Sequence, residues 1–263
     1  MTQPRSLLLA AKEPQCFRVI NASAGGNFVF TCDHASARIP LRLQNLGLTS
    51  ADLARHIAWD LGAAEVTVAL SEHLDAWAIL QNYSRLVIDC NRPLAAPDSM
   101  VASSDGIRIP GNHALSDSDR AMRRDEIFQP YHSRITEQLD GRRSAGRPTL
   151  LVAVHSFTPV WEGRPRPWEA GVLYHRDPRV ARILLEQLRA EHGAVIGDNE
   201  PYSLSDTTDF TIPVHGEQRR LPHVEVELRQ DLIASAAGRA NWVERLANAL
   251  RCAEIKLLSY AVP

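Results

Sequence analysis

Two histidines of the 263-residue chain follow apolar segments that are typical of buried strands. His34 comes two residues after the segment 27–32, and His155 comes directly after the segment 149–154. Because the carboxyl ends of parallel strands meet at one edge of a sheet, we expect both imidazoles at that edge. A single histidine at the end of a strand is more often a polar loop residue than a ligand. Together with a carboxylate, however, two imidazoles form a ligand set for catalytic Zn²⁺, which polarises a carbonyl and acidifies a bound water.

Further side chains that can move a proton or bind an anion follow other apolar segments. Glu225 and Glu227 lie in the segment 224–228, and a free carboxylate beside a metal can take the proton of the bound water. Asn91 and Arg92 follow the segment 85–90, and a guanidinium binds a carboxylate through two parallel hydrogen bonds. These residues predict a hydrolytic site that recognises a small carboxylate-bearing molecule.

Several other catalytic sites are excluded because their motifs are missing. The sequence has no H-E-x-x-H, no G-x-S-x-G and no glycine-rich phosphate loop of the Walker or Rossmann type. A Cys32 nucleophile with His34 as its base is an alternative, but Cys32 fits the buried end of a strand better. The cysteines form no C-x-x-C pair, which excludes zinc-ribbon and thioredoxin motifs and favours a reducing compartment.

The charge and hydropathy of the chain narrow the range of partners. Lys and Arg number 29 and Asp and Glu 31, so the net charge is 29 − 31 = −2 and no nucleic-acid partner is expected. No window of about 18 apolar residues exists, so we expect no transmembrane helix and no membrane partner. The N-terminal apolar run is too short for a secretory signal, and the expected location is cytoplasmic. The oligomeric state stays open.

Strand-like and helix-like segments alternate along the chain, which predicts an α/β fold. The predicted strands are 27–32, 85–90, 149–154, 171–174, 194–196 and 224–228, and the predicted helices are 60–74, 116–139, 178–192 and 239–260. We expect three α/β/α layers around a mixed, mainly parallel sheet, in one domain over residues 1–263, because no Ser/Gly/Pro-rich linker interrupts the chain. The proline-rich stretch 159–167 predicts a surface lid. Trp161 and Trp168 flank this segment, and their rings can either close over a substrate or pack on the surface.

Seven segments in order along the chain resemble the N-formylglutamate amidohydrolase family. They are TCDHASARIP (31–40), HIAWDLGA (56–63), YSRLVIDCNRP (83–93), PYHSRI (130–135), VAVHSFTP (152–159), GDNEPYS (197–203) and HVEVELRQDLI (223–233). The family is similar in architecture to zinc carboxypeptidases and aspartoacylase-like amidases. The resemblance therefore implies a zinc-carboxypeptidase-like fold and a metal-dependent amidohydrolase. The implied reaction converts N-formyl-L-glutamate to formate and glutamate.

The resemblance also implies roles for individual residues. It makes His34 and His155 metal ligands and Glu227 the general base, and it assigns the substrate carboxylate to Asn91 and Arg92, with Arg85 as a second cationic candidate. The implied cofactor is Zn²⁺ or another divalent cation, since histidine and carboxylate ligands suit several metals.

The third metal ligand departs from the carboxypeptidase pattern. Those enzymes carry a glutamate three residues after the first histidine, where this sequence has Ala37. Asp60, at the start of a predicted helix, is our choice, and a plain N-cap is its alternative role. Asp33 and Glu200 are the reserve candidates.

Two other functions stay open at this level. A carboxypeptidase-like or peptidoglycan-type metallo-amidase would use the same residues on a larger substrate. A non-catalytic carboxylate-binding protein on the same fold is the other alternative, and the missing glutamate ligand motivates it.

Overall fold

A seven-stranded sheet forms the centre of the computed structural model, which describes residues 7–190 and 193–258. Its strands are β1 (Phe17–Ile20), β2 (Phe28–Cys32), β3 (Trp77–Gln81), β6 (Leu150–Phe157), β9 (Ala170–Leu173), β10 (Ile196–Asp198) and β11 (His223–Arg229). They lie in the order β1-β3-β2-β6-β11-β9-β10. The pairs β2–β3, β2–β6, β6–β11 and β9–β10 are parallel, whereas β1–β3 and β9–β11 are antiparallel. The predicted mixed, mainly parallel sheet is confirmed.

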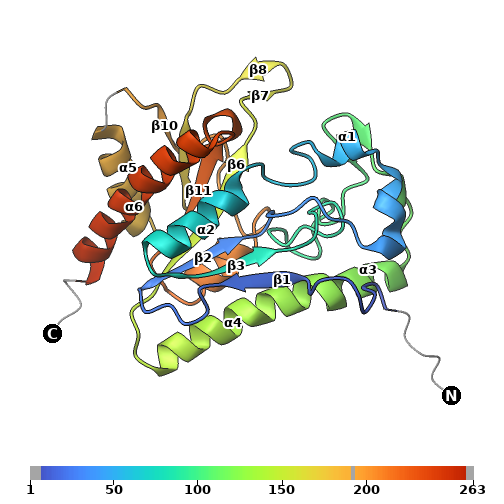
Figure 1. The fold of residues 1–263 in the computed structure, drawn as a ribbon, viewed down its shortest axis with the longest axis horizontal. Helices are drawn as coiled ribbons and strands as arrows, with labels where there is room; N and C mark the ends of the chain where they lie inside the picture. Colours follow the sequence, from blue (N-terminus) through green and yellow to red (C-terminus); the bar gives the residue numbers. More distant parts are fainter. Residues whose placement is uncertain (1–6, 191–192, 259–263) are drawn as a thin grey trace.

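Helices cover both faces of this sheet, which gives the three predicted layers (Figure 1). One face packs against α2 (Ala63–His73), α5 (Arg179–Ala190) and α6 (Ala236–Leu258). The other face packs against α4 (Gln129–Ser144) and the π-helical turn η3 (Arg124–Phe128) that precedes it. Each layer thus buries the apolar side of its helices against the sheet.

Shorter elements form the connections. They are η1 (Leu41–Gly47), α1 (Ser50–Leu53), β4 (Ser103–Ser104), β5 (Ile107–Arg108), η2 (Pro110–Asn112), α3 (Asp117–Arg123), β7 (Val160–Trp161), β8 (Arg164–Pro165), η4 (Ile212–Glu217) and η5 (Gln230–Leu232). The predicted lid contains the two-stranded β7–β8 hairpin, which projects from the sheet (Figure 1). Among the described helices, none has the length and apolar character needed to cross a membrane.

Side chains of the central strands alternate between the two cores. On β6, Val152 and Val154 join the core under α2, α5 and α6, while Leu151 and Ala153 join the core under α4. Because successive side chains of a strand point to opposite faces, the next residue, His155, lies on the α4 face. On β11, the three apolar residues Val224, Val226 and Leu228 belong to the α2 side. The intervening glutamates therefore share the face of His155.

The predicted strand over 85–90 is wrong. The strand is β3, eight residues earlier in the chain, and residues 85–90 form turns instead. Their apolar side chains are nevertheless buried in the α4-side core. Side-chain donors replace a strand ladder here, because Asn112 Nδ2 donates to the Leu86 carbonyl at 2.7 Å and Arg123 Nη1 donates to the Val87 carbonyl at 2.9 Å.

The remaining predicted elements occur within a few residues of their expected bounds. The single helix expected over 116–139 is divided into α3, η3 and α4. Residues 191–192 and 259–260, the last residues of two expected helices, lie outside the described residues. The edge strand β1 has no counterpart among the predictions.

Candidate active site

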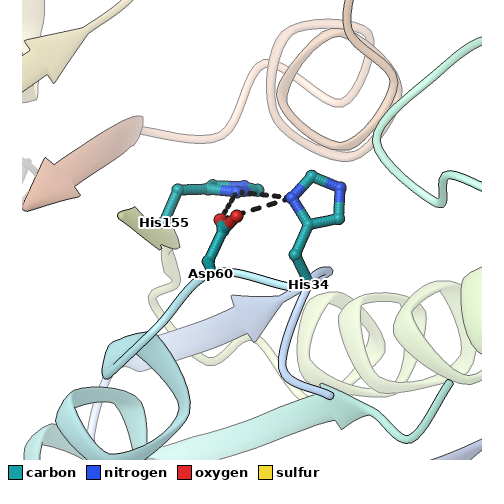
Figure 2. A group of neighbouring side chains, drawn as sticks. All are labelled: His34, Asp60 and His155. Atoms are coloured by element: carbon teal, nitrogen blue, oxygen red, sulfur yellow. Dashed lines mark hydrogen bonds and ion pairs between the residues drawn. The ribbon is translucent and has the colours of Figure 1, made fainter. Parts of the chain in front are cut away.

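Three different connections bring His34, Asp60 and His155 together (Figure 2). His34 follows β2, His155 lies near the end of β6, and Asp60 precedes α2. All three side chains are buried. The backbone N–H of Asp60 donates to the His34 carbonyl at 2.9 Å, which ties the two segments together. The N-cap of α2 is Gly62, so the Asp60 carboxylate faces the histidines rather than capping the helix.

The donor atoms of these three residues form a compact triangle. The Nδ1 atoms of His34 and His155 are 3.2 Å apart, and Asp60 Oδ2 lies 3.3 Å from the first and 2.9 Å from the second. Ligands of tetrahedral zinc with Zn–N bonds of about 2.0–2.1 Å lie about 3.3 Å from one another. The triangle therefore matches one face of a tetrahedral metal site, and the residues fit a divalent cation.

The far nitrogens of both imidazoles point at carboxylates. His34 Nε2 lies 2.7 Å from Asp89 Oδ1, and His155 Nε2 lies 3.5 Å from Asp33 Oδ2 and 3.8 Å from Glu225 Oε2. A proton on His34 Nε2 satisfies the short contact to Asp89, whereas His155 Nε2 makes no hydrogen bond among the described residues. A cation bound among the three donors would take the lone pairs of the two Nδ1 atoms, which lie 3.2 Å apart.

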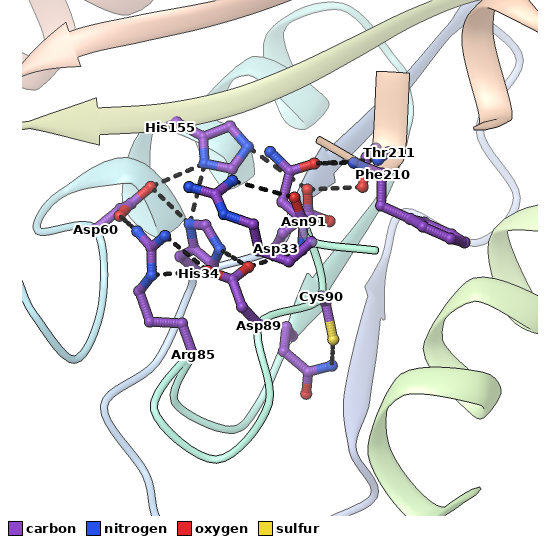
Figure 3. Close-up of polar contacts among 12 residues, drawn as sticks. Asp33, His34, Asp60, Arg85, Asp89, Cys90, Asn91, His155, Phe210 and Thr211 are labelled. Atoms are coloured by element: carbon purple, nitrogen blue, oxygen red, sulfur yellow. Dashed lines mark hydrogen bonds and ion pairs between the residues drawn. The ribbon is translucent and has the colours of Figure 1, made fainter. Parts of the chain in front are cut away.

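The supporting carboxylates are themselves held in place (Figure 3). Asp89 Oδ2 accepts from Nε and Nη2 of Arg85 at 3.1 and 2.7 Å. Asp33 accepts from the Tyr131 hydroxyl at 2.7 Å and from the Thr211 hydroxyl at 2.8 Å. Burial opposes the charge of Asp33, but the hydrogen bond and charge of His155 outweigh it and lower its pKa to about 2. Both carboxylates thus stay ionised behind the two histidines.

Glu227 lies beside the triangle with a free oxygen. In the β6–β11 register it is the direct partner of His155, on the same face of the sheet. Its Oε2 is buried and has no hydrogen-bond partner among the described residues. Burial raises the pKa of Glu227 to about 8, a rise that His155, Arg85 and Arg166 oppose and that Asp60 reinforces. A carboxyl with such a pKa can both accept and return a proton near neutral pH.

Glu225 is also buried with a raised pKa but faces another side of His155. Burial raises the pKa of Glu225 to about 8, against the opposing charge of His155. Its Oε2 lies near His155 Nε2 and 3.5 Å from Asn91 Nδ2, on the side away from the donor triangle. Glu225 therefore lies behind His155, whereas the free oxygen of Glu227 lies beside the donor triangle.

A cleft of about 550 Å³ opens beside the triangle. Its walls include His34, Asp60, His155 and Glu227, together with Arg85 and Trp161. Trp161 belongs to the predicted lid and stacks edge-on against His56 with their ring centroids 5.9 Å apart. The volume is that of a small-molecule site.

The predicted carboxylate-binding residues Asn91 and Arg92 also line this cleft but have protein partners. Asn91 Oδ1 accepts from the backbone N–H groups of Phe210 and Thr211 at 3.1 and 3.0 Å. Arg92 Nε donates to Asp98 at 2.8 Å, and its Nη1 donates to the carbonyl of Thr208 at 2.5 Å. Both residues thus join the 85–98 loop to the segment before η4.

The reserve ligand candidates occupy other positions. Asp33 lies behind His155, and the Glu200 carbonyl packs over β9. A second cluster, His175, Asp206 and Glu217, also brings donor atoms together. Arg176 pairs with both carboxylates of that cluster, so its charge is already balanced.

The sequence did not predict the residues that hold His34 and Asp33 in position. Asp89 could have been found, since it precedes Asn91 and Arg92 in the same motif, and Arg85 stands four residues before it. Tyr131 and Thr211 carry no such signal, because their contact with Asp33 joins segments 98 and 178 residues apart.

Comparisons with known proteins give a consistent result. A sequence profile of the family described as N-formylglutamate amidohydrolase matches residues 26–234. The gene product Atu2144 from Agrobacterium tumefaciens is 36% identical, with a TM-score of 0.92 over 95% of this chain and 99% of that one. The N-formylglutamate amidohydrolase from Ralstonia eutropha JMP134 shares the fold at 16% identity, with a TM-score of 0.64 over 92% of this chain and 98% of that one. No curated protein matches the sequence.

Proposed function

The chain belongs to the N-formylglutamate amidohydrolase family, and from this premise we propose that it hydrolyses the amide of small N-acylated acidic amino acids with the help of a divalent cation. N-formyl-L-glutamate is the proposed substrate, and formate and glutamate are the products. The observation that carries the proposal is the donor triangle of His34, Asp60 and His155 beside the unpartnered carboxyl of Glu227.

The metal is assigned to the triangle because its donors suit one. His34 and His155 would each supply a nitrogen and Asp60 an oxygen, a set that favours Zn²⁺ among common cations. Burial opposes the charge of Asp60, yet the neighbouring imidazoles hold the pKa of that carboxyl well below its usual range. When bound, such a cation polarises the amide carbonyl and lowers the pKa of water.

Glu227 moves the proton in the proposed reaction. Its carboxylate accepts a proton from the water whose oxygen forms the new C–O bond at the acyl carbon. The C–N bond then breaks, and Glu227 returns the proton to the leaving amine nitrogen. The buried position of Glu227 keeps its pKa near 8, so neither transfer is strongly uphill at neutral pH.

The walls of the cleft support a small anionic substrate. Arg85 and Arg92 are among the residues that line its volume of about 550 Å³, although each also pairs with a protein carboxylate. N-formylglutamate is small enough for this space, since ligand sites of roughly 300–1,000 Å³ hold molecules up to drug size. A small carboxylate partner remains part of this proposal.

Formate release from N-formyl-L-glutamate by the purified protein tests the proposal. The assay is run on the protein as isolated, after removal of metal with a chelator, and after Zn²⁺ is added back. We expect release that the chelator abolishes and zinc restores. Metal in the protein without formate release would point to an amidase of larger substrates, and absence of both to a carboxylate-binding protein.

A further inference from the structure

We propose that Arg166 is the residue that determines specificity for an acidic substrate, by binding one of the substrate's carboxylates at the β7–β8 end of the cleft. This inference rests on the proposed hydrolysis of an acidic N-acyl amino acid and names the side chain that selects it. It reassigns the anion-binding role that the sequence gave to Asn91 and Arg92.

Arg166 carries a guanidinium that has no carboxylate partner among the described residues. Its Nη1 donates a hydrogen bond to the Tyr202 hydroxyl at 2.8 Å, and no ion pair among the described residues includes it. A half-buried guanidinium that faces only a neutral oxygen retains donors for an incoming anion.

Aromatic side chains of the cleft hold this guanidinium in place. Its central carbon lies 4.9 Å from the ring centroid of Tyr202, 5.4 Å from that of Trp161 and 5.7 Å from that of Phe157. All three rings belong to residues that line the cleft. Stacking on rings restricts the side chain without neutralising its charge, which is the preorganisation that bidentate carboxylate binding requires.

The two arginines that line the cleft are already paired. Arg85 gives two hydrogen bonds to Asp89 and lies 3.6 Å from Asp60, so its charge is balanced by protein carboxylates. Arg92 pairs with Asp98. A substrate carboxylate at either position competes with a protein anion, whereas at Arg166 it meets no such competitor among the described residues.

Arg166 is also close to the reacting groups and is backed by a fixed backbone. Its charge is one of those that lower the pKa of Glu227 and of His56. Its backbone N–H donates to the Pro159 carbonyl at 2.8 Å, and its carbonyl accepts from Arg229 Nη1 at 3.4 Å. The side chain therefore stands on an anchored hairpin at the margin of the catalytic centre.

The test compares Arg166→Met and Arg166→Lys with the wild type on three substrates: N-formylglutamate and its two mono-amides, one with the α-carboxylate and one with the side-chain carboxylate replaced. Loss of a charge-assisted pair should lower kcat/KM of Arg166→Met for N-formylglutamate about 10- to 100-fold. The loss should fall mainly on KM, and Arg166→Lys should recover part of it. The same variant should lose little further on one of the mono-amides, which identifies the carboxylate bound.

Arg164→Met is the matched control. Arg164 lies on the same hairpin, two residues away, and is exposed. We expect its kinetics to equal those of the wild type. An unchanged kcat/KM in Arg166→Met, or an equal loss on all three substrates, would overturn the proposal, because the first denies a contact and the second indicates a general disturbance of the site.

A binding measurement separates this inference from the proposed function. Glutarate, a dicarboxylate without an amide, should raise the Tm of the wild type and of Arg164→Met progressively as its concentration increases, but not that of Arg166→Met. If no N-acyl substrate is hydrolysed while this difference persists, the proposed function fails and the anion site stands. If N-formylglutamate is hydrolysed and Arg166→Met binds glutarate normally, the function stands and the anion site fails.

Discussion

Glu227 and His155 are direct partners across the parallel pair β11–β6, and both lie on the face of the sheet that α4 covers. A proposed proton carrier and a proposed metal ligand thus come from adjacent positions of two central strands. Strands buried on both faces are among the most rigid elements of an α/β fold. The relative position of these two groups therefore depends on the sheet itself and not on a mobile loop.

Replacing Glu227 with Gln should remove most turnover while metal stays bound. The amide has nearly the same shape but cannot accept the proton, and general acid–base catalysis contributes about 10²- to 10⁴-fold. Rate measurements on N-formylglutamate, with elemental analysis of the same sample, check both parts. A variant that retains a near-normal rate would contradict the proton-transfer role.

His34→Ala and His155→Ala should each lower the metal content of the purified protein. Each change removes one of three donors that lie within 4.8 Å of one another. Zinc stoichiometry after dialysis against a weak chelator gives the measurement. The control is His113→Gln, at an exposed position outside the donor triangle. Unchanged stoichiometry in both alanine variants would exclude ligation by these residues.

Asp89→Asn tests the contact between the Asp89 carboxylate and the His34 imidazole. The carboxylate of Asp89 orients His34 through a 2.7 Å contact, and loss of such an outer partner typically weakens metal binding about 10- to 100-fold. Competition with a chromophoric zinc chelator measures this affinity directly. An affinity equal to that of the wild type would show that Arg85 and the backbone suffice to hold the imidazole.

The sequence predicts the part of this site that depends on strands. The segments 27–32 and 149–154 are apolar on both faces and 224–228 alternates apolar and acidic residues, so all three are recognisable as strands. Because the carboxyl ends of parallel strands meet at one edge of a sheet, His34, His155 and the glutamates of the last segment are expected close together.

The parts that could not be predicted depend on contacts between distant segments. Residues 85–90 are as apolar as a strand, but two of their carbonyls accept hydrogen bonds from the side chains of Asn112 and Arg123. The spacing of apolar residues along the sequence does not reveal these contacts. The pairing of Arg92 with the Thr208 carbonyl spans 116 residues. Without that contact in view, the sequence favours Arg92 as an anion binder.

Gly171→Ala should disturb the loop that carries Tyr202. A Cβ at this position would lie 2.1 Å from the Glu200 carbonyl oxygen, and Gly171 is the register partner of Glu227. We expect a loss of about 1–3 kcal/mol of stability, as for other overpacked sites, together with reduced activity. Gly141→Ala is the matched control, because a Cβ there meets no atom within 4 Å and α4 should gain stability. Urea unfolding of both variants distinguishes the two effects, and equal stabilities would contradict the close packing.

The buried pair His132–His215 should make the protein less stable in acid. His132 Nε2 lies 2.8 Å from the Cys90 carbonyl, which places its proton there, and its Nδ1 then accepts from His215 Nε2 at 3.0 Å. Burial lowers the pKa of His132 to about 4 and that of His215 to about 3, although Asp33 opposes both shifts. At pH values between these pKa values and the pKa of about 6.5 in the unfolded chain, the unfolded chain binds more protons than the folded protein. The neutral pair therefore stabilises the folded protein fully above pH 6.5, and this stabilisation is lost as the pH falls.

The variant His215→Gln isolates this effect from other titrating groups. Glutamine can still donate to His132 but takes up no proton, so the fall in unfolding free energy between pH 7 and pH 5 should shrink by about 1–2 kcal/mol. Chemical unfolding at both pH values gives the measurement, with His113→Gln at an exposed position as the control. If His215→Gln and the wild type lose the same stability over this interval, the histidine pair is not buried in its neutral form and the acid sensitivity arises elsewhere.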